Sequence, residues 1–243
     1  MSKQKKVRTL PDFLIIGAQK CGTTSLFHYL IQHPQILAPN EKELHFFDLY
    51  YENGFDWYKS QFPPKPVNGR KVLSGEATPK YIYEENVPQL VFQHMPNVKL
   101  IVLLRNPVDR AYSHYQMELK NQHPELICEG GDIVTFAEAL ERDFDGIVTR
   151  GLYAEQLKRW FKLFPRNQIL VLQSEQFFTE PERVLQRVFH FLGLPAIKLT
   201  HYEPLLKGDY DEMPPDESLK LSAYYRPYNL RLYQLLKQNF LWN

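Results

Sequence analysis

Four short apolar runs recur along the chain, and each is followed by a segment whose apolar positions have helical spacing. The runs are DFLIIGA at 12–18, KVLSGEA at 71–77, VKLIVLL at 98–104 and QILVLQSE at 168–175. Continuous runs of this kind are typical of strands buried on both faces of a parallel sheet. The alternation predicts an α/β fold, a three-layer sandwich in which helices flank a central parallel sheet.

Helices are expected to begin where a capping residue or a proline precedes the periodic segment. The predicted starts are Thr23, Pro88, Pro107, Thr135, Leu152, Glu180 with Pro181, and the segment after PPDES at 214–218. The last helix is expected to break near Pro227, because proline lacks an N–H group and its ring clashes with the preceding turn. The tyrosines and leucines around Pro227 have helical spacing and are assigned to the core.

The composition bounds the size and the charge of the protein. A chain of 243 residues with 44% hydrophobic content can bury one sizeable core. We expect a flexible basic tail over residues 1–11 and a single domain over residues 12–243. The net charge of +1 gives no global field that would favour nucleic acid, so any anion must be bound by a local cluster.

Cysteine usage and hydropathy indicate the compartment. Cys21 and Cys128 are the two cysteines, too few for a disulfide framework, and no zinc-binding spacing is present. The apolar runs are far shorter than the roughly 20 residues that span a bilayer, and the first residues lack the apolar segment of a signal peptide. The sequence therefore predicts a cytoplasmic protein with no membrane partner, either a monomer or a weak homodimer.

The segment GAQKCGTTS at 17–25 is predicted to be a P-loop that binds an anion. Gly17 and Gly22 have the spacing of a nucleotide-binding loop, but Lys20 lies inside the loop and Thr23 follows the second glycine. The N–H groups at a helix start favour a phosphate. The alternative is a plain strand-to-helix turn in which the glycines allow close packing.

Arg105 and Ser113 offer a second anion site. Arg105 ends an apolar run where a magnesium-dependent triphosphate site would need an acidic residue, and Ser113 follows on the expected helix. Glu76 ends another run, and side chains at the carboxyl ends of parallel strands should face one crevice. A guanidinium and a hydroxyl suit a terminal phosphate. The alternative for Arg105 is an ion pair with Asp109 or Glu76.

Four motifs in this order carry a family resemblance: GAQKCGTTSL, KELHFFD, LLRNPVDRAYSHY and GLYAEQLKRWF. From about Asp12 to the C-terminus the chain resembles the sulfotransferases that use 3'-phosphoadenosine-5'-phosphosulfate (PAPS), and most closely the heparan sulfate branch. The resemblance implies a sulfuryl transfer to a hydroxyl, or less readily an amine, of a carbohydrate-like or small acceptor. It also implies PAP as the product and no metal.

The resemblance assigns the donor site residue by residue. The 5'-phosphosulfate is expected on the loop, with Lys20 contacting the sulfuryl group and the bridging oxygen. Arg105 and Ser113 are expected to bind the 3'-phosphate, Tyr153 to lie near the donor, and Lys207 with Gly208 to begin a loop that closes over it. The loop residues assigned to the donor are Gly17, Gln19, Lys20, Cys21, Gly22, Thr23, Thr24 and Ser25.

The acceptor side depends on the segment EKELHFFD at 41–48. An attacking hydroxyl must lose its proton, and Glu43 matches the catalytic glutamate of the family, with His45 as the reserve base. Asp48, Glu76 and Lys80 are expected to face the acceptor. The alternative is that Glu41, Lys42 and Glu43 form a solvated charged turn, while HFF at 45–47 packs as a strand.

Two departures from the family pattern limit the choice of acceptor. Many glycosaminoglycan-modifying relatives have a lysine where this chain has Ala77, and a basic residue where it has Asp209. Asp209 would repel a sulfated chain. Two other functions stay open from the sequence: a P-loop kinase or nucleotide triphosphatase, for which magnesium dependence would discriminate, and a non-catalytic module that binds a nucleotide or sulfated glycan.

Overall fold

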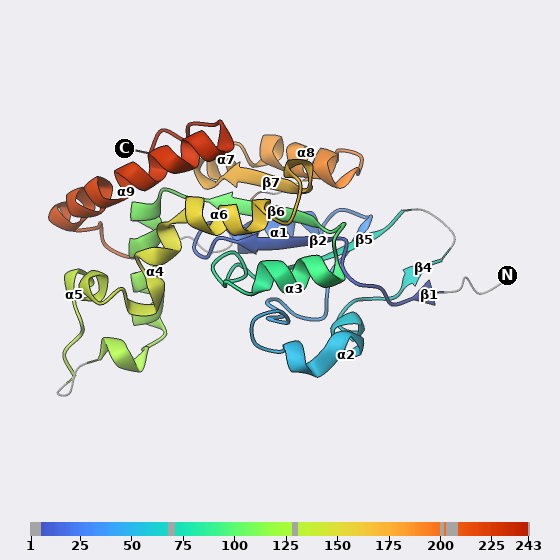
Figure 1. Ribbon diagram of the computed structural model, residues 1–243, viewed down its shortest axis with the longest axis horizontal. Coiled ribbons are helices and arrows are strands. Elements are labelled where there is room, and N and C mark those ends of the chain that lie inside the picture. Colours follow the sequence, from blue (N-terminus) through green and yellow to red (C-terminus); the bar gives the residue numbers. More distant parts are fainter. Residues whose placement is uncertain (1–5, 68–70, 128–130, 200–201, 203–208, 243) are drawn as a thin grey trace.

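The computed structural model describes residues 6–67, 71–127, 131–199, 202 and 209–242. At its centre lies a five-stranded sheet with the order β3-β5-β2-β6-β7, in which all neighbouring strands are parallel (Figure 1). The strands are β2 (Phe13–Gly17), β3 (Ile36–Leu37), β5 (Leu73–Ala77), β6 (Lys99–Leu104) and β7 (Ile169–Gln173). The predicted α/β fold with a central parallel sheet is confirmed.

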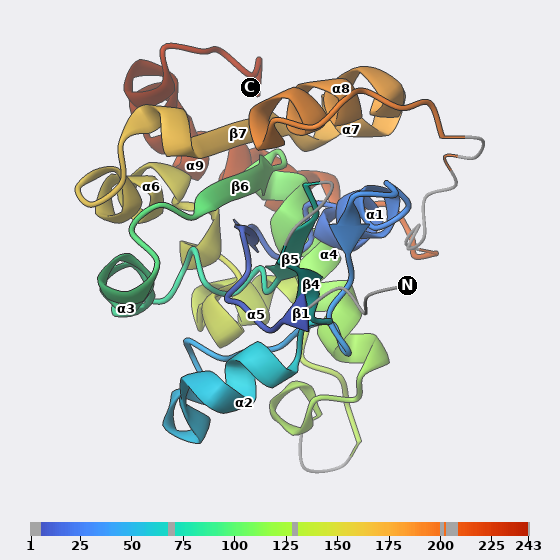
Figure 2. The same ribbon diagram turned by 90° about the vertical axis from the view of Figure 1, so that its right-hand side faces the viewer.

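Helices cover both faces of the sheet. Figure 2 shows α1 (Thr23–Leu30) and α8 (Pro181–Leu192) on one face, and α3 (Val87–His94) and α6 (Tyr153–Phe161) on the other. The residues of β2 and β5 are all buried, as expected for strands that pack on both faces.

Five further α-helices belong to the described part of the chain. They are α2 (Gly54–Ser60), α4 (Pro107–Lys120), α5 (Phe136–Glu141), α7 (Ser174–Thr179) and α9 (Pro215–Leu236). The predicted starts at Thr23, Pro107 and Pro181 are confirmed as first helical residues. Thr135 caps α5 with a complete capping box, in which it exchanges hydrogen bonds with Glu138.

The predicted break near Pro227 is wrong, because α9 continues through this proline. Leu221 and Tyr225 before it and Leu232 after it are buried, and the Tyr225 hydroxyl donates to the Val148 carbonyl across 2.8 Å. Packing on both sides of the proline therefore keeps the segment helical despite the lost N–H group. The assignment to the core is confirmed for Leu221, Tyr225 and Leu232, but it is wrong for Tyr224 and Leu230, which are 42% and 55% exposed.

The first described residues are attached to the domain. Strand β1 (Lys6–Val7) pairs antiparallel with β4 (Lys65–Pro66). The guanidinium of Arg8 donates to the carbonyl oxygens of Ser60 and Phe62 across 2.7 and 2.5 Å. The flexible tail expected over residues 1–11 therefore does not extend over residues 6–11, because backbone pairing and this arginine hold them against the domain.

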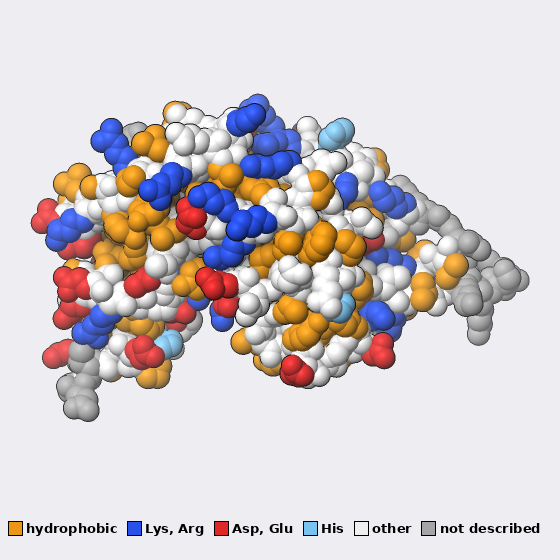
Figure 3. Space-filling model, viewed as in Figure 1, with side chains coloured by type: hydrophobic (Ala, Val, Ile, Leu, Met, Phe, Trp, Pro, Cys, Tyr) orange, Lys and Arg blue, Asp and Glu red, His pale blue; other side chains and the backbone are white. Residues whose placement is uncertain are grey.

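The surface in Figure 3 mixes basic and acidic side chains over α6. Lys158 lies 2.9 Å from Glu155, and Arg159 lies 3.8 Å from Glu85. Among the described residues, no helix is long and apolar enough to cross a bilayer. The cytoplasmic location stays a prediction.

Candidate active site

A cavity of about 640 Å³ opens at the carboxyl ends of the central strands. Its lining residues are Gln19, Lys20, Gly22, Thr23, Thr24, Ser25, Tyr29, Glu43, Pro79, Arg105, Ser113, Met117, Phe177, Phe178, Pro181, Tyr202 and Tyr210. The volume lies within the range of ordinary cofactor pockets. The cavity brings together the loop after β2, the end of β6 and the segment that begins at Glu43. Of the strand-end residues expected to face one crevice, Arg105 lines it, whereas Gly17 and Glu76 do not.

The loop between β2 and α1 turns sharply before the helix. Gly22 is the residue before the first turn of α1 and has a φ of +87°, which favours glycine. A Cβ at this position would lie 2.8 Å from the Phe178 ring. No side chain caps α1, and Thr23, Thr24 and Ser25 of its first turn line the cavity, at the end of a helix that favours an anion.

Lys20 reaches the cavity from a left-handed backbone conformation, with a φ of +68°. Burial lowers the pKa of this ammonium, and the charges of Arg105 and Arg110 lower it further, while Glu118 partly offsets them. Positive charges gathered around one cavity repel one another until an anion neutralises them. The site is therefore electrostatically prepared for an anionic ligand.

Arg105 and Ser113 line the same cavity, from the end of β6 and from α4. Between described residues, no ion pair within 4 Å joins Arg105 to Asp109 or Glu76, although the charge of Arg105 lowers the pKa of Asp109, which burial raises. Arg105 therefore forms neither of the two ion pairs considered as alternatives, and its guanidinium is available to a ligand.

Three of the predicted donor residues lie behind the cavity wall instead of in it. Tyr153 is 1% exposed, and its hydroxyl donates to the Arg105 carbonyl across 2.9 Å. Cys21 is fully buried with its Sγ 3.8 Å from the Tyr153 oxygen, and burial raises the pKa of this thiol. A Cβ on Gly17 would lie 2.4 Å from the Ile82 side chain. These residues support the loop and Arg105 through packing.

The segment from Glu43 to Asp48 places three titratable groups in a row. Oε2 of Glu43 lies 3.3 Å from Nε2 of His45, and Nδ1 of His45 lies 2.8 Å from Oδ2 of Asp48. Lys42 lies 2.9 Å from the other oxygen of Glu43. Glu43 lines the cavity, whereas the Asp48 side chain is 2% exposed. The strand considered as an alternative for residues 45–47 does not form, and the chain makes a turn after His45 instead.

The charges of this row follow from its contacts. The hydrogen bond to Asp48, with that to Glu43, raises the pKa of His45 to about 9. Burial alone would raise the pKa of Glu43, but the hydrogen bond from His45 and the charge of Lys42 lower it. At neutral pH the imidazole is therefore protonated and the Glu43 carboxylate is ionised.

Glu76 and Lys80, both expected to face the acceptor, do not line the cavity. Glu76 is 1% exposed and accepts hydrogen bonds from Tyr58, Tyr81 and Thr78. Lys80 lies 3.4 Å from Glu84, four residues along the chain. Lys207 and Gly208 lie outside the described residues.

Sequence reasoning missed the apolar part of the cavity wall. Its main contributors are Phe177 and Phe178 of α7, Tyr29 of α1, Met117 of α4 and Tyr210. Aromatic and apolar side chains carry no motif, so most of these positions gave no signal. The two phenylalanines follow β7, and the rule that ligands lie beyond the carboxyl ends of parallel strands would have pointed to them.

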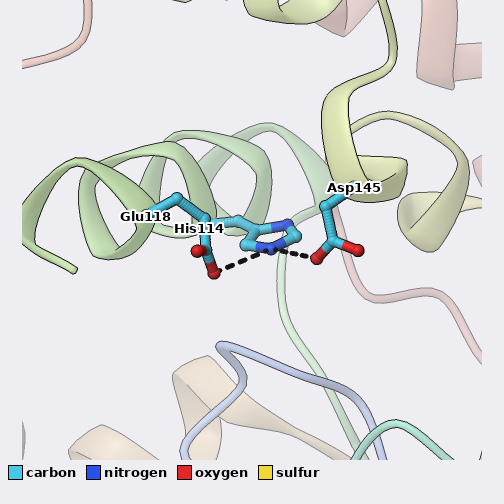
Figure 4. A group of neighbouring side chains, drawn as sticks. All are labelled: His114, Glu118 and Asp145. Carbon is cyan, nitrogen blue, oxygen red and sulfur yellow. Dashed lines mark hydrogen bonds and ion pairs between the residues drawn. The ribbon is translucent and has the colours of Figure 1, made fainter. Parts of the chain in front are cut away.

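A second group of titratable side chains lies beside the cavity, on α4 and the turn near residue 145 (Figure 4). Nε2 of His114 lies 3.1 Å from Asp145 and 3.7 Å from Glu118. An arginine can only donate, so Arg110, 3.4 Å from Nδ1, makes that nitrogen the acceptor and leaves the proton on Nε2. The proton on Nε2 leaves no lone pair there for a metal.

Asp145 is engaged from a second side as well. The Arg150 guanidinium donates to its Oδ1 across 2.9 Å. Burial would raise the pKa of Asp145, but the hydrogen bond from His114 and the charge of Arg150 lower it to about 2. The group is thus a chain of hydrogen bonds from α4 to the turn, and it holds the helix that carries Ser113.

The fold and this site together define a sulfotransferase. A crystal structure of a sulfotransferase from Alicyclobacillus acidocaldarius matches with a TM-score of 0.80 at 29% identity, covering 96% of this chain and 98% of that one. A crystal structure of the mouse sulfotransferase SULT7A1 complexed with PAP shares the fold with a TM-score of 0.50 at 19% identity, over 93% of this chain and 66% of that one.

The family model of the sulfotransferase domain matches residues 10–207, and the chain belongs to this family of transferases. Among curated relatives, the human heparan sulfate glucosamine 3-O-sulfotransferase 6 is 32% identical over 97% of this chain and 74% of its own length. The membrane-associated sulfotransferase kil1 of Dictyostelium discoideum is 28% identical over 98% and 67%.

A third relative is much longer than this chain. The human bifunctional heparan sulfate N-deacetylase/N-sulfotransferase 3 is 33% identical over 97% of this chain, which covers 31% of that protein.

Proposed function

We propose that this sulfotransferase uses PAPS as its donor and transfers the sulfuryl group to an acceptor hydroxyl without a metal ion. The observation that carries the proposal is that Lys20, Arg105, Ser113 and Glu43 line one cavity. Three of them suit the anionic groups of the donor, and the fourth suits the proton of the acceptor. The PAP in the structure of a sulfotransferase with the same fold supports the same donor here.

The two anion sites fit a nucleotide with phosphate groups on both sides of its ribose. The first-turn N–H groups of α1 with Thr23 and Thr24 would bind the 5'-phosphosulfate. Arg105 and Ser113 would bind the 3'-phosphate, and the aromatic rings of Phe177 and Phe178 offer an apolar wall for the base. The donor supplies a sulfuryl group whose bond to the bridging oxygen breaks as the acceptor oxygen attacks sulfur.

We assign separate proton and charge roles to two residues. Glu43 is ionised at neutral pH, since its pKa is lowered, and it takes the acceptor proton as the new bond forms. The Lys20 ammonium stabilises the negative charge that develops on the leaving oxygen. A transferring sulfuryl carries less charge than a phosphoryl, so a lysine and backbone N–H groups suffice without magnesium.

The acceptor is proposed to be carbohydrate-like or another small hydroxyl compound. The curated relatives named for heparan sulfate support a saccharide. Ala77 and Asp209 stand where glycosaminoglycan-modifying relatives are expected to carry basic residues. We therefore favour a less anionic acceptor than a highly sulfated chain.

Calorimetric titration with PAP, ADP and ATP, each with and without magnesium, tests the donor assignment without any acceptor. We expect tight binding of PAP in the presence of EDTA and much weaker binding of ADP, which lacks the 3'-phosphate. Preference for ATP with magnesium would instead indicate a phosphotransferase. Binding of PAP without turnover of any acceptor in a broad screen would indicate a binding module.

A further inference from the structure

Glu76 is a fully buried carboxylate without a basic partner among the described residues. It lies at the end of β5 and is 1% exposed. Its Oε1 accepts from the hydroxyls of Tyr58 and Tyr81 across 2.5 and 3.2 Å, and its Oε2 accepts from Thr78 across 3.0 Å. Burying a carboxylate is costly, so a residue that only fills space here would be better replaced by an apolar side chain.

Two of the three hydroxyls connect Glu76 to the segment that carries Glu43. The N–H of His45 donates to Oγ1 of Thr78 across 3.4 Å, and the N–H of Phe47 donates to the Tyr81 oxygen across 3.3 Å. A hydroxyl has a single proton. Because Thr78 and Tyr81 donate theirs to Glu76, their lone pairs face the two N–H groups of the segment.

Besides these two contacts, the His45 carbonyl accepts hydrogen bonds from the N–H groups of Leu49 and Tyr50, both across 3.0 Å. The segment lies outside any helix or strand, and His45 has a left-handed φ of +49°. A residue without glycine's freedom stays in such a conformation only where its surroundings hold it. Phe46 and Phe47 anchor the segment by burial, and the two hydroxyls from the Glu76 cluster bind its backbone between Glu43 and Asp48.

We propose that Glu76 is the positioning residue for the catalytic segment: its carboxylate orients the Thr78 and Tyr81 hydroxyls, which hold the backbone at His45 and Phe47 so that Glu43 faces the cavity. This role replaces the direct acceptor contact expected for Glu76 from the sequence. It rests on the proposed role of Glu43 as the base.

The third hydroxyl provides a matched control. Tyr58 donates to the same carboxylate oxygen as Tyr81, and both tyrosines are 0% exposed. The Tyr58 hydroxyl makes no hydrogen bond to the backbone at 45–47 within the described chain, and its ring stacks on Phe46 at 4.2 Å. Tyr58→Phe therefore removes the shorter of the two tyrosine hydrogen bonds to Glu76 and keeps both the ring and the backbone contacts of the segment.

The test measures the ring pKa of His45 by NMR in Tyr81→Phe, Thr78→Val and Tyr58→Phe. The chain has eight histidines, and His45→Asn assigns the signal. Loosening the backbone should weaken the His45 contacts to Glu43 and Asp48, so its pKa should fall by at least about 0.5 in Tyr81→Phe and Thr78→Val. Tyr58→Phe should leave it unchanged. Equal values in all four proteins, or an equal fall in Tyr58→Phe, would overturn the proposal.

Turnover adds a second measurement once an acceptor is known. Tyr81→Phe and Thr78→Val should each lower kcat about threefold to tenfold, the range that one hydrogen bond supports, with the Kd for PAP unchanged. A loss of PAP affinity equal to the loss of kcat would indicate general unfolding and contradict the assignment. If the wild-type protein sulfates no acceptor, the proposed function fails, while the NMR comparison still decides the positioning role.

Discussion

The imidazole of His45 donates from Nε2 to Oε2 of Glu43 across 3.3 Å. This contact keeps the cavity-facing carboxylate ionised, because a positive charge at hydrogen-bond distance favours the deprotonated form. The same imidazole is held from its other nitrogen by Asp48 at 2.8 Å. In the proposed mechanism Glu43 accepts the proton, and His45 is the cation beside it.

Glu43→Gln should abolish proton acceptance while leaving the donor site intact. We expect kcat to fall about 10²- to 10⁴-fold, the usual contribution of a general base, with the Kd for PAP within about twofold of the wild type. Steady-state kinetics and calorimetry measure the two quantities separately. Full activity of Glu43→Gln would contradict the assignment of Glu43 as the base.

Lys20→Ala should remove the charge that stabilises the leaving oxygen. Loss of one such contact typically lowers kcat about 10²- to 10³-fold. The variant should also lose the salt sensitivity of turnover that comes from this ammonium. A rate unchanged from the wild type would show that the backbone N–H groups of α1 act alone.

Arg105→Ala should weaken PAP binding and spare ADP binding, because the missing guanidinium is assigned to the 3'-phosphate. A hydrogen bond to a charged group contributes about 1.5–3 kcal/mol, so the Kd for PAP should rise about tenfold to a hundredfold. Ser113→Ala should have the same direction and a smaller effect. Equal losses for PAP and ADP would contradict the 3'-phosphate assignment.

The pKa of about 9 for His45 predicts how stability depends on pH. The pKa of His45 in the folded protein is raised above the ordinary value of 6.5. The stability that protonated His45 contributes is therefore fully present below pH 6.5 and is lost as the pH rises toward 9. Urea unfolding at intervals across that window should show the free energy of unfolding falling more in the wild type than in His45→Asn. Parallel curves for the two proteins would refute the shifted pKa.

The raised pKa of Glu76 predicts that the free energy of unfolding also depends on pH in a lower range. Burial raises its pKa from 4.5 to about 7, so between these values the folded protein binds a proton that the unfolded chain releases. Stability from this group is therefore greatest below pH 4.5 and declines as the pH rises to 7. Glu76→Gln, which is neutral at every pH, should flatten this decline. The difference between the two unfolding curves isolates the group from the other carboxylates.

The sheet could be predicted from the sequence because its strands are buried on both faces and so read as continuous apolar runs. The first helix and α4 could be predicted because glycine or proline marks their starts. The course of α9 through Pro227 could not, since it depends on Tyr225 and Leu232 packing against distant elements. Local preference was outweighed there by tertiary contacts.

The charged residues that line the cavity could be predicted from the sequence, and the contacts of the buried residues behind them could not. Lys20, Arg105 and Glu43 stand in motifs whose chemistry is visible in the residue types. Tyr153 stands in such a motif too, but the structure turns its hydroxyl to the Arg105 carbonyl, away from the cavity. The direction of a side chain depends on packing that no local pattern contains. The same limit hid the link from Glu76 through Thr78 to His45.

In the sheet order β3-β5-β2-β6-β7, the middle strand is β2, which comes first along the chain among the strands of this sheet. During synthesis on a ribosome, β2 and the loop that follows it emerge long before β6 supplies a neighbour on one side, and β7 is made later still. Tyr153 and its ring neighbour Trp242, 6.0 Å away, are both made after β6. Long-range pairings of this kind form slowly. The loop after β2 therefore lacks part of its support until β6, β7 and the segment that carries Tyr153 have been made.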